Sequence, residues 1–132
     1  MEKTNLITRI ENTILQWDET SIGIGDFGAI AFLYRGKEFA HIHKNGDLDI
    51  DFGKKITSEL RQKNLVQRHL YVPETSITFR VLNEEQLPFA VSLLRFSYLG
   101  HFKKANANDV AAQKIMEQEA AKLPESLRAM NW

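Results

Sequence analysis

The chain has no cysteine among its 132 residues. This excludes disulfide bridges, thiolate metal sites and cysteine nucleophiles. The chain also lacks an excess of either charge, because 17 Lys and Arg balance 17 Asp and Glu. Without an overall field that attracts polyanions, we expect no nucleic-acid partner. No long apolar run is present. We therefore expect neither a signal peptide nor a membrane span, and a cytoplasmic protein.

What the chain does have is enough length for one domain with its own core. We predict a single α+β domain over residues 1–132. Its parts are an N-terminal helix (1–20), a sheet with central helices (21–104), and a C-terminal helix and tail (105–132). We expect a mainly antiparallel sheet of about four strands, a three-strand meander plus one, covered by helices.

Hydrophobic periodicity places the individual elements. Helical spacing predicts helices over residues 3–17, 54–64, 83–102 and from about 106 to 124. Asn83 is the expected N-cap of the third, most apolar helix. Alternation predicts strands over residues 29–34, 75–82 and on both sides of Asn45-Gly46 between 38 and 52, with residues 66–72 left as a loop or edge segment.

Three glycines, Gly23, Gly25 and Gly28, have the spacing of a dinucleotide-binding loop. That loop needs a strand before the glycines and a helix after them, so that the helix N-terminus meets the pyrophosphate. Here a predicted helix precedes them and a predicted strand follows. The sequence therefore argues against a dinucleotide cofactor.

The dipeptide Asn45-Gly46 is the strongest hairpin signal in the chain. We predict a two-residue loop there, which sets His41 opposite Ile50. We predict a second tight turn at Gly36-Lys37, which sets Phe32 opposite His41. Since side chains alternate along a strand, His41 and His43 would then both lie on the apolar face of the meander.

In the same register Asp47, Asp49 and Asp51 lie on the opposite, wetter face of the strand. Alternating aspartates could bind calcium, but a loop that wraps the ion is missing. We interpret the three aspartates as a solvated row.

The pair His41 and His43 is the clearest functional signal, because titratable rings in an apolar face need a partner or a purpose. Two such nitrogens, completed by His69, would suit general acid–base chemistry or a divalent metal such as zinc or iron. The structural alternative is that each is a core histidine bonded to backbone or to Tyr34. We predict that a ligand would also contact Phe32, Tyr34 and Tyr98.

A set of residues between Glu38 and Tyr98 forms a further pattern: His41-x-His43-x-x-Gly46, Leu48-x-Ile50, Leu60, His69 and Phe96-Ser97-Tyr98. This pattern resembles the small domain family named after the fungal luciferase, whose members are mostly of unassigned function. The luciferase itself is similar to an oxygenase of a hydroxylated styryl-pyrone that uses molecular oxygen without a separate redox cofactor.

A weaker resemblance links the chain to YjbR-like α+β proteins. It rests on Gly36-Lys37-x-Phe39-Ala40 and on Ser97-Tyr98. It implies a related architecture and a DNA-binding or adaptor role, of which the neutral charge argues against duplex binding.

These observations leave two functional hypotheses. The first is binding, and turnover, of a small apolar or aromatic ligand in a pocket lined by His41 and His43. The second is a non-enzymatic interaction or adaptor module that docks through an exposed sheet face or through the apolar tail with Met130 and Trp132. A cavity over the histidines would favour the first hypothesis. The oligomeric state stays open, a homodimer included.

Overall fold

The computed structural model describes the backbone of residues 2–130 and the side chains of residues 5–130. In chain order the elements are α1 (Glu2–Ile14), β1 (Thr20–Ile24), a 3₁₀ turn (Asp26–Gly28), β2 (Ile30–Tyr34), β3 (Lys37–Ile42), β4 (Asp47–Asp51), α2 (Gly53–Gln62), β5 (Gln67–Arg68), β6 (Ser76–Arg80), a second 3₁₀ turn (Glu84–Gln86), α3 (Leu87–Ala105), α4 (Val110–Ala120) and α5 (Glu125–Arg128).

The strands form one antiparallel sheet in the order β1-β2-β3-β4-β6-β5. This confirms the predicted α+β class with an antiparallel sheet, but the sheet has six strands where we expected about four. The two additional strands, β1 and β5, are the edges of the sheet. Strand β1 contains a glycine and β5 has only two residues, so neither shows the alternation from which strands are predicted.

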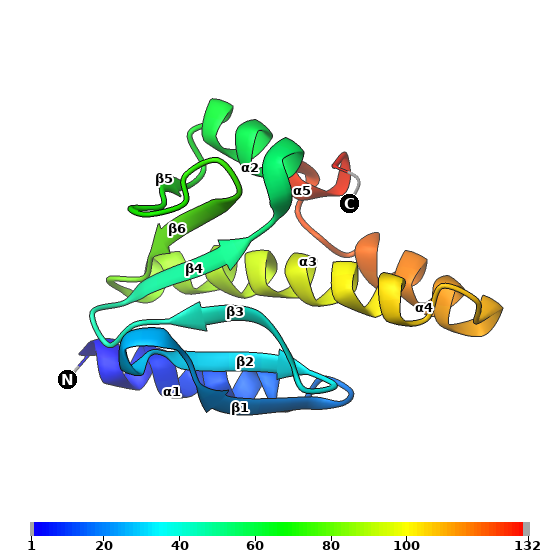
Figure 1. Ribbon diagram of the computed structural model, residues 1–132, viewed down its shortest axis with the longest axis horizontal. Coiled ribbons are helices and arrows are strands. Elements are labelled where there is room, and N and C mark those ends of the chain that lie inside the picture. The colour runs from blue at the N-terminus through cyan, green and yellow to red at the C-terminus, as the bar shows by residue number, and fades with distance from the viewer. Residues whose placement is uncertain (1, 131–132) are drawn as a thin grey trace.

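Helix α3 runs along one face of the sheet, where it contacts β2, β3 and β4, and α1 packs beside it (Figure 1). The Asn83 side chain accepts from the N–H of Glu85, and Gln86 completes a capping box, so Asn83 is the N-cap of the 3₁₀ turn (Glu84–Gln86) that leads directly into α3. Helix α4 begins later than predicted, after Asp109, whose carboxylate accepts from the N–H of Ala112. The core lies between α1, α3 and the sheet, and among its fully buried members are Leu6, Ile10, Ile14, Phe32, Ile42, Leu48, Ile50, Ile77, Leu93 and Phe96.

The turn between β3 and β4 has three residues, 44–46, and not the predicted two. The N–H of His43 donates to the carbonyl oxygen of Asp47 at 2.9 Å, and His41 pairs with Asp49. Gly46 takes the left-handed position, with φ of +99°, as loops of this length require. The predicted pairing of His41 with Ile50 is therefore wrong.

The reason for the longer turn lies in the core. Ile42, Leu48 and Ile50 are all buried on the face that α3 covers. A two-residue turn would have turned Ile42 to the opposite face from Leu48 and Ile50. A shift of one residue reverses the face of every side chain on a strand, so β4 buries its apolar residues and turns Asp47, Asp49 and Asp51 toward the histidines.

The turn between β2 and β3 also differs from the prediction. It is formed by Arg35 and Gly36, which both have positive φ, at 50° and 80°. A bulge then shifts the register, so that His41 pairs with Ala31 and not with Phe32. The predicted apolar surroundings of the histidines are therefore wrong. His41 lies on the face of the sheet away from α3.

Candidate functional site

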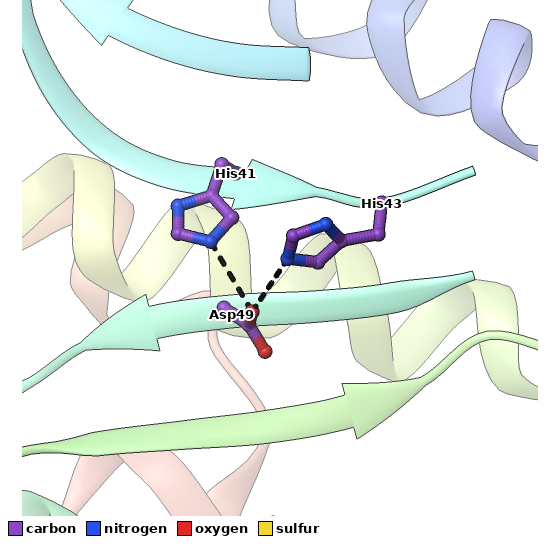
Figure 2. A group of neighbouring side chains, drawn as sticks. All are labelled: His41, His43 and Asp49. Atoms are coloured by element: carbon purple, nitrogen blue, oxygen red, sulfur yellow. Dashed lines mark hydrogen bonds and ion pairs between the residues drawn. The ribbon is translucent and has the colours of Figure 1, made fainter. Parts of the chain in front are cut away.

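Three imidazole rings converge on a single carboxylate oxygen on the outer face of the sheet. Asp49 Oδ2 lies 3.0 Å from His43 Nε2 and 3.2 Å from His41 Nε2, as Figure 2 shows. His69 Nε2 lies 3.6 Å from the same oxygen. The structure thus brings together the three histidines that the sequence analysis named as candidates. They surround Asp49, which the sequence analysis had not named as a site residue.

The Asp49 carboxylate is held by strands on both sides. Its residue is only 8% exposed, and its Oδ1 accepts a 2.6 Å hydrogen bond from the Thr78 hydroxyl on β6. Burial by itself would raise the pKa of Asp49, but the hydrogen bonds from His41 and Thr78 lower it below the usual value. Asp49 is therefore an anion with one oxygen fixed by Thr78 and the other turned to the histidines. Asp49 is not part of a solvated row, as we had expected.

His41 lies between two carboxylates. Its Nε2 faces Asp49, and its Nδ1 lies 2.9 Å from Oε2 of Glu38. The hydrogen bond with Asp49 is the main cause that raises the pKa of His41 to about 9; Glu38 adds to it, and burial opposes it. In the protein without ligands, His41 is therefore an imidazolium at neutral pH.

His69 reaches the cluster from the segment that follows β5. Its Nδ1 accepts from the backbone N–H groups of Tyr71 and Val72, each at 3.1 Å. A neutral imidazole has one donor and one acceptor nitrogen. Because Nδ1 accepts, Nε2 carries the proton, and it points this N–H toward Asp49.

A cavity of about 650 Å³ opens above the cluster. The cluster residues His41, His43, Asp49 and His69 form its polar part together with Thr78. Its apolar part consists of four exposed side chains, which we call the apolar rim: Phe27, Leu70, Tyr71 and Val72, with exposed fractions of 92%, 79%, 76% and 50%.

The charges that line the cavity are acidic. Five carboxylates contribute to its wall, and no Lys or Arg side chain does so among the described residues. The carboxylates belong to Asp26, Glu38, Asp47, Asp49 and Asp51.

The other predicted ligand contacts, Phe32, Tyr34 and Tyr98, lie on the helix side of the sheet and are buried. The Tyr34 hydroxyl accepts from Asn106, and the Tyr98 hydroxyl donates to the carbonyl of Asp18. Burial raises the pKa of Tyr98 to about 12. The structure does not bring these three residues together with the histidines, and it gives both tyrosine hydroxyls partners in the core.

One ligand atom each from His41, His43 and Asp49 lie within 4.8 Å of one another, so these three residues could hold a metal ion. Sequence reasoning missed Asp49, Glu38 and Thr78. One sequence signal could have revealed Asp49. Ile42, Leu48 and Ile50 can all be buried on the same face of the sheet only if the turn has three residues, and that register places Asp49 on the same face as the histidines.

The fold and this cluster define a small α+β domain with a His/Asp cavity on the open face of an antiparallel sheet. Residues 36–97 match the family model described as a luciferase domain. This part of the chain, which contains the whole His/Asp cluster, is similar to the luciferase domain family, as its residues had indicated.

Other comparisons add nothing to this assignment. No curated protein and no solved structure matches the chain. The weaker resemblance to YjbR-like proteins stays a prediction. Within residues 2–130, the helices are all too short or too polar to cross a membrane.

Proposed function

We propose that the cavity binds a small ligand with an apolar or aromatic body that is uncharged or cationic. The observation that carries this proposal is the cavity itself, in which an apolar rim surrounds a polar floor of three histidines and Asp49. Pockets of several hundred Å³ with few, convergent polar groups are typical of small-molecule sites. The chain places four exposed apolar side chains around this one opening.

The charge of the cavity restricts the ligand. Five carboxylates line the wall, whereas the charged His41 is already paired with two of them, Asp49 and Glu38. An anionic ligand would meet like charges with no free cation to offset them among the lining residues. A neutral or cationic ligand meets no such repulsion.

The same proposal gives His41 a chemical role. A general acid must be protonated at working pH and within hydrogen-bonding reach of the ligand. His41 is protonated because Asp49 and Glu38 raise its pKa to about 9. Both of its ring nitrogens face carboxylates, those of Asp49 and Glu38, so in the metal-free chain it can pass a proton to a ligand that takes the place of one of these contacts.

Binding is tested with three probes that share a ring and differ in charge: 2-naphthol, 2-naphthylmethylamine and 2-naphthoate. We expect the neutral and cationic probes to bind and the anionic probe to bind at least tenfold more weakly, measured by probe fluorescence and by amide shifts. Removing the rim ring with Tyr71→Ser should weaken the two binding probes about fivefold, since an aromatic contact contributes about 1 kcal/mol.

The matched control is Val110→Ser on α4, which removes a side chain that is 85% exposed and does not line the cavity. It should leave probe binding unchanged. Equal weakening by both variants, or preference for the naphthoate, would refute the proposal.

The alternative, an interaction module, would dock through an exposed sheet face or through the C-terminal tail. Met130 is only 4% exposed and packs in the core, and Trp132 lies outside the described residues. The exposed apolar side chains that line the cavity are those of the apolar rim. Failure of all three probes to bind would leave the rim as a protein-docking surface and would return the alternative to first place.

A further inference from the structure

We propose that His41 Nε2, His43 Nε2 and Asp49 Oδ2 form a three-residue site for one divalent first-row transition-metal ion, with its open coordination positions facing the cavity. The site does not depend on the organic ligand proposed above, because it uses protein atoms alone. Metal titration without any organic ligand therefore tests it separately.

The spacing of the three atoms fits a coordination sphere. Asp49 Oδ2 lies 3.0 and 3.2 Å from the two Nε2 atoms. Two ligands that are each about 2.1 Å from a metal ion lie roughly 3.0 Å apart at an octahedral angle and roughly 3.4 Å apart at a tetrahedral one. For these two nitrogen–oxygen pairs little movement is needed for an ion to replace the hydrogen-bonded protons, and all three atoms lie within 4.8 Å of one another. Two histidines and one carboxylate are the donor set of zinc sites and of non-haem iron sites.

The surroundings hold two of the three ligands, His41 and Asp49, in the orientation that a metal requires. Ligating histidines usually donate their other ring N–H to a carboxylate, and ligating carboxylates are themselves hydrogen-bonded. His41 meets this condition through Glu38, 2.9 Å from its Nδ1. Asp49 meets it through Thr78, which occupies Oδ1 and leaves Oδ2 for the ion.

The charges also favour a dication. With a metal bound, His41 and His43 must be neutral, because a nitrogen lone pair has to face the ion. The two positive charges of the ion are then balanced by the carboxylates of Asp49 and Glu38.

His69 is excluded from the ligand set by its hydrogen bonds. Its Nδ1 accepts two backbone N–H groups, so its Nε2 is protonated and lacks a lone pair for the ion. Its N–H instead points toward Asp49 Oδ2 at 3.6 Å, which suits a positioning residue. Asp49 is therefore the third ligand, a role for which the sequence analysis had named His69.

The test titrates the full chain, freed of any affinity tag and stripped with a chelator, with Zn²⁺ by calorimetry. We expect one ion per chain. His43→Ala and Asp49→Asn should each weaken zinc binding at least 100-fold. Glu38→Gln should weaken it about 10- to 100-fold, as is usual for residues that hydrogen-bond a metal ligand. His69→Ala should weaken it less than tenfold. The matched control is Asp51→Asn, an exposed carboxylate of the same strand and cavity that should leave affinity within a few fold of the wild type.

The proposal can still be tested if the variants fail to fold. Co²⁺ can be added to the wild-type chain, and its paramagnetic effect on the histidine ring signals can be measured by NMR. The ring signals of His41 and His43 should show the largest paramagnetic shifts, and those of His101, the fourth histidine of the sequence, the smallest. The proposal is overturned if no ion binds, if Asp51→Asn weakens binding as much as Asp49→Asn, or if His69→Ala abolishes it.

Discussion

Replacing Gly46 with alanine is expected to destabilise the protein by about 2–5 kcal/mol. Gly46 has a φ of +99°, and a Cβ built there would lie 2.4 Å from the carbonyl oxygen of Val81. The left-handed conformation costs alanine about 1–2 kcal/mol, and relief of the overlap must move backbone, which adds about 1–3 kcal/mol. The movement would also break the hydrogen bond from the Val81 N–H to the Gly46 carbonyl. Urea unfolding at equilibrium measures the loss.

Gly36→Ala provides the control, because Gly36 has a similar φ of +80° and an alanine Cβ at this position would have nothing within 4 Å of it. Gly36→Ala should lower the free energy of unfolding by about 1–2 kcal/mol, which is the cost of the left-handed backbone conformation alone. If Gly46→Ala costs no more than Gly36→Ala, the close approach between the β3–β4 turn and the end of β6 is wrong.

The second large effect is a loss of stability at alkaline pH in the metal-free protein. The pKa of His41 is raised from 6.5 to about 9 in the folded chain, so folding favours the imidazolium. This stabilisation is fully present below pH 6.5 and is lost as the pH rises through about 9. A shift of this size corresponds to about 3 kcal/mol.

Urea unfolding of the chelator-treated chain between pH 6 and pH 10 measures this dependence. The groups that face His41 are Glu38 on its own strand, Asp49 on β4 and the neighbouring ring of His43. In Asp49→Asn the largest cause of the shift is removed, so we expect a flatter profile. Parallel profiles for the two proteins would show that Asp49 does not set the pKa of His41.

Much of the fold could be predicted from local patterns. The buried face of α3, its cap at Asn83 and the alternation that marks β6 are all visible in a short window of sequence. The edge strands β1 and β5 were not visible, because their pairing depends on neighbours that the sheet supplies and not on their own alternation.

The candidate site was predicted only in part, and the reason is the length of one turn. Asn45-Gly46 is compatible with a two-residue loop and with a three-residue loop, since both need positive φ at Gly46. The choice between them is made at long range, by the burial of Ile42 and by the contact with Val81. The local signal therefore found the histidine pair but placed it on the wrong face, and it hid Asp49.

His69 shows the complementary case. Nothing in its own segment predicts a role, and only the family pattern singled it out. The structure brings it to Asp49 because β5 pairs with β6 beside β4, which carries the following segment over the histidines.

The central claim is that the three-residue turn puts Asp49 beneath His41 and His43, and proton NMR tests it most directly. His43 and Asp47 are a hydrogen-bonded pair, so the next pair, Ile42 and Leu48, brings its two Cα atoms closest together. We predict a strong nuclear Overhauser effect between the α-protons of Ile42 and Leu48. A strong signal between the α-protons of His43 and Leu48 instead would mean a two-residue turn, with Asp49 on the face opposite the histidines, and would contradict the account.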